Sequence, residues 1–203
     1  IKLETSAPTA KGIFNAINTT YKFLTNKELE GSAIAISGIG KVGSKLSKLL
    51  YEKKANLIVS NAGRDPIEQL KQDKISFIES GINSIFEQKC DIISPCALGG
   101  VINSETKKKL KCKAIVGAAN NQLDNQETAL WLKENNIFYA PDYLVNSGGV
   151  IAISCEINNS EDTLNDQLNK ISDKVLSLLK ESKKSILSTD RIVEDLAWKR
   201  INS

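Results

Sequence analysis

The residues with the clearest chemical use are Gly38, Gly40 and Gly43, which form the pattern Gly-x-Gly-x-x-Gly. Glycines at this spacing let the backbone turn sharply, approach a diphosphate closely and pack a helix against its strand. A strand-forming run precedes them at residues 33–37, and apolar residues repeat at helical spacing after them. The N–H groups and positive dipole end of that helix would face the phosphates. The pattern predicts a dinucleotide site at Gly38, Gly40, Lys41, Val42 and Gly43; the alternative is a glycine-rich turn without a ligand.

A second informative position is Asn61, which ends the next strand-forming run at residues 56–60. In NAD-binding folds an acidic residue at this point accepts hydrogen bonds from the adenosine ribose. Asn61 can bond a ribose hydroxyl but does not repel a 2′-phosphate, and Arg64 could pair with such a phosphate. Arg64 could equally be a simple loop residue. These two residues therefore leave NAD and NADP both open as cofactors.

Three further loops follow strand-forming runs, at residues 95–100, 118–121 and 141–149. Ligands of open α/β sheets bind outside the carboxyl ends of the strands, where these loops would meet. Their small residues allow a flat ring to approach, and Asn120 and Asn146 offer amide groups suited to a carboxamide or a ribose. Each asparagine alone is more often a turn residue. Three such loops on one edge favour a ligand site.

The elements that must position these loops alternate along the chain. We expect helices at 7–24, 41–54, 65–72, 104–110 and 127–135, one helical turn at 84–87, and strands at 33–37, 56–60, 75–78, 90–95, 113–117 and 137–140. This order predicts a Rossmann-type, doubly wound α/β fold, with a mostly parallel sheet and helices on both faces.

No strand-forming run follows residue 140. Residues 150–157 are apolar, and amphipathic helices are expected at 162–184 and 189–199. In the last helix, Ile192, Val193, Leu196 and Ala197 should face inward. We therefore expect one dinucleotide-binding domain over 1–203, made of an N-terminal helix (7–24), a core (31–150) and C-terminal helices (151–203).

The composition narrows the class of protein. The 203 residues are 41% hydrophobic and carry a formal charge of +3, enough for one domain with a core. The basic run at 107–113 is expected to be a solvated helix end, so a nucleic acid is not an expected partner. No apolar run approaches the length of a membrane span, so a membrane is not an expected partner either. Four scattered cysteines, with no apolar span or secretory signal, predict a reducing compartment, the cytoplasm.

Two residue types are missing from the chain. It has no histidine, which excludes histidine acid–base chemistry and histidine metal ligands within it, and no metal site is predicted. It also has no methionine, even at position 1, so we expect a part of a longer protein or a processed piece.

Longer segments carry a specific resemblance. The segments 8–12, 38–43, 90–100, 117–123 and 139–150, in this order, resemble the cofactor-binding domain of the leucine, phenylalanine and valine dehydrogenases, within the glutamate dehydrogenase-like superfamily. The Pro-Cys-Ala-Leu-Gly-Gly block at 95–100 is the sharpest. Glutamate dehydrogenases usually have a Ser-Glu-containing segment there, so the branched-chain and aromatic group fits better.

The resemblance implies an activity and residue roles. Such enzymes oxidatively deaminate an L-amino acid to a 2-oxo acid and ammonia, passing hydride to a nicotinamide cofactor, NAD or possibly NADP. Beyond the glycine loop, it implies cofactor contacts from Thr9, Asn61, Cys96, Ala97, Ala119, Asn120 and Asn146. Thr9, Asn120 and Asn146 would fix the carboxamide and nicotinamide ribose. Val150 and Ile153 would touch the substrate side chain, which implies an apolar amino acid.

The resemblance also implies what lies elsewhere. Two lysines and an aspartate of the family act from a separate N-terminal catalytic domain, which would precede Ile1, and members are commonly homo-oligomers. This chain should therefore bind cofactor but catalyse nothing alone. One alternative is a non-catalytic nucleotide-binding module or the remnant of a split dehydrogenase. Another is a 2-hydroxy-acid or alanine dehydrogenase, but these generally need a histidine near the nicotinamide.

Overall fold

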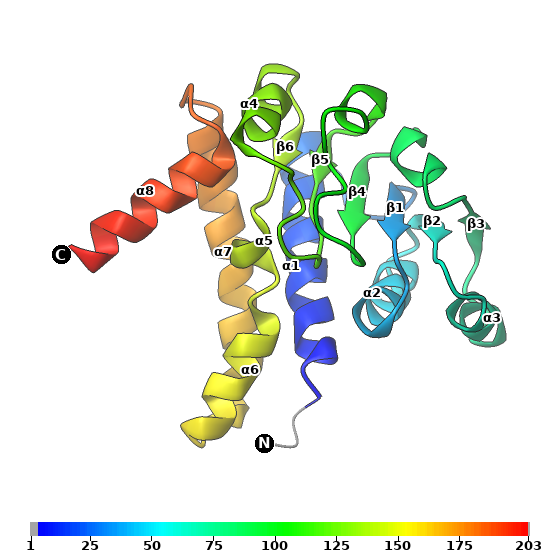
Figure 1. Ribbon diagram of the computed structural model, residues 1–203. Coiled ribbons are helices and arrows are strands. Elements are labelled where there is room, and N and C mark those ends of the chain that lie inside the picture. Colours follow the sequence, from blue (N-terminus) through cyan, green and yellow to red (C-terminus); the bar gives the residue numbers. More distant parts are fainter. Residues whose placement is uncertain (1–3, 203) are drawn as a thin grey trace.

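The computed structural model describes residues 4–202 and is built around one parallel sheet (Figure 1). The six strands lie in the order β3-β2-β1-β4-β5-β6, and every pair is parallel. Their bounds are β1 Ala33–Ser37, β2 Asn56–Ser60, β3 Phe77–Glu79, β4 Ile92–Pro95, β5 Ala114–Ile115 and β6 Phe138–Tyr139. The predicted Rossmann-type sheet is confirmed. Its strand order reverses between β1 and β4, where such folds bind ligands.

Alternate residues of the central strands enter two separate cores. Ile34 and Ile36 of β1 face one core, whereas Ala35 faces the other. The first core is covered by four long elements: α1 (Ser6–Thr25), α2 (Lys41–Glu52), α3 (Asp65–Gln72) and α7 (Leu164–Ser182). Both faces of the strands are apolar because both are covered, as expected of a parallel sheet. The predicted helices on both faces are confirmed.

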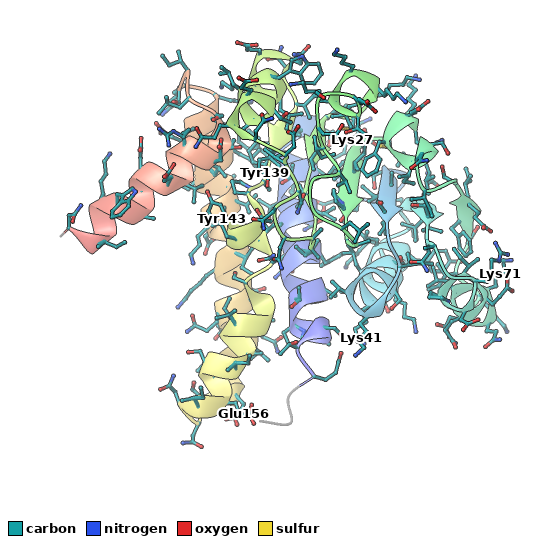
Figure 2. The ribbon with its side chains drawn as sticks, in the orientation of Figure 1. Lys27, Lys41, Lys71, Tyr139, Tyr143 and Glu156 are labelled. Carbon is teal, nitrogen blue, oxygen red and sulfur yellow. The ribbon has the colours of Figure 1, made fainter. Side chains whose placement is uncertain are left out.

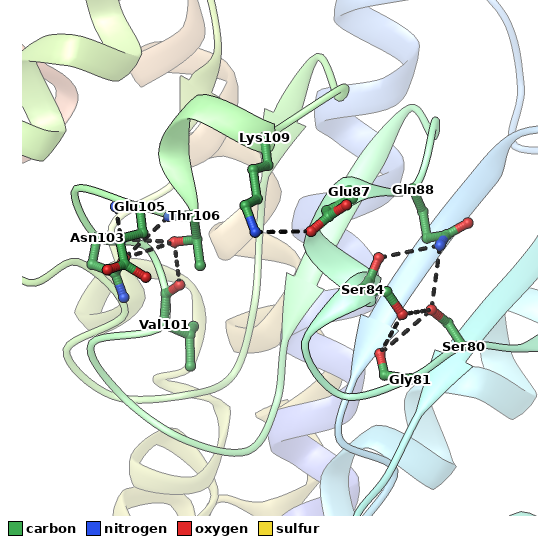
Figure 3. Close-up of polar contacts among 10 residues, drawn as sticks. All are labelled: Ser80, Gly81, Ser84, Glu87, Gln88, Val101, Asn103, Glu105, Thr106 and Lys109. Carbon is green, nitrogen blue, oxygen red and sulfur yellow. Dashed lines mark hydrogen bonds and ion pairs between the residues drawn. The ribbon is translucent and has the colours of Figure 1, made fainter.

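The second face is covered mainly by short elements: η1 (Ser84–Glu87), η2 (Lys107–Lys109) and α4 (Gln126–Glu134). Polar contacts hold the first two in place (Figure 3). The Lys109 ammonium lies 3.0 Å from the Glu87 carboxylate, and the Gln88 amide donates to the Ser84 carbonyl at 3.1 Å. Short turns need such side-chain bonds because each makes few backbone hydrogen bonds of its own.

Two predicted elements are shorter or shifted. The helix expected at 104–110 is only η2, although the Asn103 carboxamide oxygen accepts from the amides of Glu105 and Thr106 as a helix cap would (Figure 3). The helix stops because the chain becomes extended at Leu110, with ψ 132°, and Lys111 then pairs with Lys89. The strand expected at 75–78 is β3 at 77–79, because Ile75 still belongs to the end of α3. Its amide donates to the Leu70 carbonyl at 3.0 Å, after Lys74 at φ 58°.

The helix α5 (Asp142–Val145) was not predicted, and α6 (Gly148–Ile157) was expected only as an apolar segment at the start of the C-terminal helical region. Two glycines open α6, and glycine disfavours helices, so the sequence showed only an apolar segment at 150–157. These glycines let α6 pack against the start of α1: a Cβ on Gly148 would lie 2.2 Å from the Pro8 carbonyl oxygen. α7 also packs on α1, where the Asn15 amide donates to the Leu168 carbonyl at 3.2 Å.

The chain ends in η3 (Glu161–Thr163), α7 and α8 (Thr189–Ile201), and the prediction for α8 is partly wrong. Ile192 is buried and Val193 half-buried, but Leu196 is 51% exposed and Ala197 is exposed as well. Only the first turns of α8 pack, because the helix runs away from the rest of the chain (Figure 1). None of the helices within residues 4–202 combines the length and apolar character needed to cross a membrane.

The two ends of α8 should therefore contribute differently to stability. We expect Ile192→Ala to lower the free energy of unfolding by roughly 2–4 kcal/mol, because it opens a cavity in the core. We expect Leu196→Ala, the exposed control, to cost less than about 0.5 kcal/mol. Urea unfolding followed by circular dichroism measures both. Equal losses would mean that Leu196 is packed in solution.

Candidate functional site

The glycine loop lies at the carboxyl end of β1, between β2 and β4. A Cβ on Gly43 would lie 2.0 Å from the Gly38 carbonyl oxygen, and one on Gly38 would lie 2.5 Å from the Ala97 Cβ. Gly38 also has a φ of 95°, which favours glycine. The loop after β1 is thus in direct contact with α2 and with the loop after β4.

Gly40 differs: it caps the start of α2, but no neighbouring atom excludes a side chain there. Its φ is −68°, and no atom lies within 4 Å of the place a Cβ would take. Among the described residues, no group accepts a hydrogen bond from the amides of Gly40, Lys41 or Val42. The start of α2 therefore combines open space with free N–H donors, which fits the diphosphate of a dinucleotide.

Lys41 adds a positive charge to this opening. Its side chain is exposed and has no ion-pair partner within residues 4–202. Figure 2 shows it at the end of the sheet opposite to Lys27, so the two lysines lie at opposite edges. The structure thus brings together the predicted Gly38, Gly40, Lys41 and Gly43, and half-buried Val42 faces the core.

The end of β2 is joined to the glycine loop by Asn61. Its carboxamide oxygen accepts from the Ile39 amide at 3.0 Å, and its NH₂ donates to the Gly63 carbonyl at 2.9 Å. The Arg64 guanidinium, three residues on, pairs with carboxylates of Glu68 and Glu79. Asn61 therefore lies beside the glycine loop, while Arg64 already has partners in the protein.

The loops after β4, β5 and β6 also meet at this edge. A Cβ on Gly99 would lie 2.6 Å from the Asn120 carbonyl oxygen. The Asn146 NH₂ donates to the Asn120 carboxamide oxygen at 2.7 Å and lies 3.4 Å from the Ala118 carbonyl. The two asparagines predicted to act together are thus hydrogen-bonded to each other, with Ala119 buried beside them.

Thr9 reaches the same region from α1. A Cβ on Gly149, at the start of α6, would lie 3.0 Å from the Thr9 hydroxyl oxygen. That hydroxyl donates to the Thr5 carbonyl at 2.9 Å, which fixes its direction. Thr9 therefore contacts Gly149, which follows Asn146 by three residues in the sequence.

Cys96 and Ala97, predicted to line the cleft, have different exposure. Ala97 is exposed, whereas Cys96 is half-buried. Burial raises the pKa of the Cys96 thiol, although hydrogen bonds with Ser94 and the backbone of Ala118 act in the opposite direction. The thiol is therefore protonated at neutral pH and suits a packing role rather than a nucleophilic one.

The predicted substrate residues both lie on α6. Val150 is 71% exposed and Ile153 is half-buried, and Ile157 continues the same helical spacing with 64% exposure. Residues at i, i+3 and i+7 share one face of a helix. α6 thus presents an apolar stripe near the start of α1.

Two positioning residues were missed by sequence reasoning. The buried Asp142 carboxylate accepts from the Asn121 amide at 2.8 Å and from the Tyr139 hydroxyl at 3.2 Å. The buried Gln122 donates to the carbonyls of Gly117 and Ala119 at 2.8 and 3.0 Å. Together they hold the loop that carries Asn120. The only sign of this role in the sequence is that Asp142 directly follows Pro141, at the end of a predicted strand.

The comparisons with known proteins decide the family. A family model described as glutamate/leucine/phenylalanine/valine dehydrogenase matches residues 57–193. The chain belongs to this dehydrogenase family. It is 38% identical to a phenylalanine dehydrogenase of Thermoactinomyces intermedius, covering 98% of this chain and 56% of that protein. A leucine dehydrogenase of the same organism is 35% identical over 94% of this chain and 53% of its own length.

The fold of this dehydrogenase family member matches solved structures as well. The L-tryptophan dehydrogenase of Nostoc punctiforme superimposes with a TM-score of 0.93 at 31% identity, covering 99% of this chain and 62% of that one. The chain thus spans about half the length of the curated relatives it matches. The resemblance inferred from the motifs is confirmed, whereas the role of each site residue stays a prediction.

Asp142 provides a test of how the loop is held. Asp142→Ala should lower the free energy of unfolding by about 1–3 kcal/mol, because it removes the acceptor for the buried Tyr139 hydroxyl and the Asn121 amide. Asp142→Asn keeps one acceptor and should lose clearly less. Thermal and urea unfolding measure both variants. Equal effects would contradict the hydrogen-bond explanation.

Proposed function

We propose that this chain is the cofactor-binding domain of an L-amino-acid dehydrogenase that acts on an apolar amino acid and uses NAD, with NADP as the alternative. The observation that carries the proposal is the opening at Gly40. A glycine whose Cβ position is open lies beside free helix amides and Lys41, which has no ion-pair partner among the described residues. A diphosphate would use all three features.

The neighbouring loops support the position of the nicotinamide. Thr9, Asn120 and Asn146 meet at the same edge, and the Asn146–Asn120 hydrogen bond fixes both amides in direction. In the proposed complex they hold the carboxamide and the nicotinamide ribose, while Cys96 and Ala97 line the wall. When bound, the nicotinamide supplies the hydride acceptor. The protein supplies its orientation, which is a large part of the catalytic effect.

The proposed substrate is an amino acid with an apolar side chain. The exposed apolar stripe on α6, with Val150 and Ile153, supports this choice. Three relatives, 34–38% identical to this chain, are a phenylalanine, a leucine and an L-tryptophan dehydrogenase, all named for apolar or aromatic amino acids. We propose that the acid–base lysines act from an N-terminal catalytic domain of the whole protein. No lysine among the described residues is buried, as an acid–base lysine of such an active site would be.

The whole protein is proposed to be a homo-oligomer in the cytoplasm, as the resemblance and the cysteine content suggest. The alternative, a non-catalytic nucleotide-binding module, would share the cofactor site. The exposed apolar stripe on α6 distinguishes the two functions, because a module that binds no substrate does not need it.

Calorimetric titration with NAD and, separately, NADP tests the cofactor site directly. We expect NAD to bind the chain. We expect Gly40→Ala to weaken this binding about tenfold or more, the effect of ~1.4 kcal/mol, because the new methyl group fills the space of the diphosphate. The melting temperature should fall only slightly, because the protein has room for the methyl group and the one cost is that alanine is a poorer N-cap for α2 than glycine. An unchanged affinity for NAD would contradict the proposed position of the diphosphate.

Lys41 is tested by a matched pair of charge removals. Lys41→Ala should weaken NAD binding about fivefold at low ionic strength, because it removes a cation beside the diphosphate. Lys27→Ala makes the same change at the opposite edge of the sheet (Figure 2) and should have no effect. The difference should shrink as salt is added. Equal effects of the two variants would show that only the overall charge matters.

A further inference from the structure

Arg64 is held by two carboxylates that come from different elements. Its Nη1 donates to Glu79, at the end of β3, and its Nη2 lies 3.1 Å from a carboxylate oxygen of Glu68, in α3. Both terminal nitrogens of the guanidinium are therefore engaged. An incoming phosphate would have to compete with these carboxylates for the same donors.

The carboxylates around Arg64 are at least as numerous as the positively charged groups. Lys71 donates to Glu68 at 2.9 Å, and Asp65 adds another carboxylate at the start of α3. The pKa of Glu68 lies below its ordinary value, chiefly because Lys71 donates a hydrogen bond to it, and Arg64 adds to the effect. Glu68 is thus ionised at neutral pH. The group as a whole carries no net positive charge, in contrast to the unpaired Lys41 at the start of α2.

This group lies where a dinucleotide places its adenosine ribose. Arg64 follows Asn61 at the carboxyl end of β2, and Glu79 is in register with Val59 on the neighbouring strand. The Ser80 amide continues this pairing with the Val59 carbonyl at 2.8 Å. In Rossmann folds the ribose is recognised at the end of β2. A phosphate on the 2′-oxygen would therefore come close to Arg64 and its two carboxylates.

Asn61 does not itself provide a charge that could exclude a phosphate. Its amide is neutral, and both of its ends already bond to the Ile39 amide and the Gly63 carbonyl. The negative charge that NAD-binding folds usually carry at the end of β2 is thus missing there. The nearest carboxylates come from β3 and α3 instead.

We propose that Glu79, together with Glu68, determines cofactor choice, by holding Arg64 and by placing negative charge where the 2′-phosphate of NADP would lie. This inference rests on the proposed dinucleotide-binding function. In this arrangement Arg64, which could have recognised a phosphate, belongs to a group in which carboxylates outnumber cations. NAD, which carries no 2′-phosphate, meets no such repulsion.

The test titrates the chain and its variants with NAD and with NADP by calorimetry. Wild type should bind NAD more tightly. Glu79→Gln should tighten NADP binding by about tenfold, because it removes one negative charge near a doubly charged phosphate and releases Arg64. Glu68→Gln should act in the same direction. Affinity for NAD should change less than about twofold, because the diphosphate lies at the other end of the loop.

Glu87→Gln is the matched control. Glu87 is similarly exposed and also pairs with a cation, Lys109 (Figure 3). It belongs to η1, which packs on the second core, whereas α3 packs on the first. Glu87→Gln should leave both affinities unchanged. Adding Arg64→Ala to Glu79→Gln should remove most of the gain in NADP binding, because the released guanidinium is then gone.

The outcomes separate this inference from the proposed function. NAD binding with an unchanged ratio of the two affinities in Glu79→Gln overturns the role of Glu79 but leaves the dinucleotide site intact. If the wild-type chain binds NADP more tightly than NAD, the role of Glu79 is likewise overturned while the dinucleotide site stands. Absence of binding by both dinucleotides in wild type and all variants overturns the proposed function, and this inference with it.

Discussion

The close approach of backbone segments at the carboxyl edge is the constraint on which the site depends. Gly43 packs so closely on the Gly38 carbonyl, and Gly38 on Ala97, that a Cβ on either glycine would overlap its neighbour. The same absence of side chains lets α6 reach the start of α1 at Gly148. Because interiors are close-packed, a single methyl group at these points would move whole loops. Thr9, the glycine loop and Asn146 share one edge only because these contacts hold.

Gly40 shows the difference between a glycine needed for folding and one that leaves room for a ligand. The three glycines of the loop look equivalent in the sequence, but only two of them fill a contact within the protein. The third faces free amides and a cation, which together attract an anion. A site can therefore be recognised by a residue whose identity the fold alone does not explain.

Much of this could be predicted from the sequence, because the informative patterns are local. Alternating apolar runs marked the central strands, and the spacing of glycines marked the start of α2. Predictions failed where distant contacts decide. η2 ends early because Lys111 pairs with Lys89, the glycines of α6 hid a helix, and Leu196 faces solvent because α8 leaves the sheet. Asp142 was missed because its partners, Tyr139 and the Asn121 amide, meet it only in the folded chain.

The role of Arg64 likewise depends on residues that are distant in the sequence. In the sequence, an arginine after a strand that ends without an acid suggests a partner for the 2′-phosphate of NADP. In the fold, β3 lies beside β2 and brings Glu79 to the same guanidinium that Glu68 already contacts. The charge that a phosphate would meet is then set by the pairing of two strands, not by the residues next to Asn61. In our proposal cofactor choice therefore depends on a neighbouring strand and on α3, which a motif confined to β1 and β2 does not include.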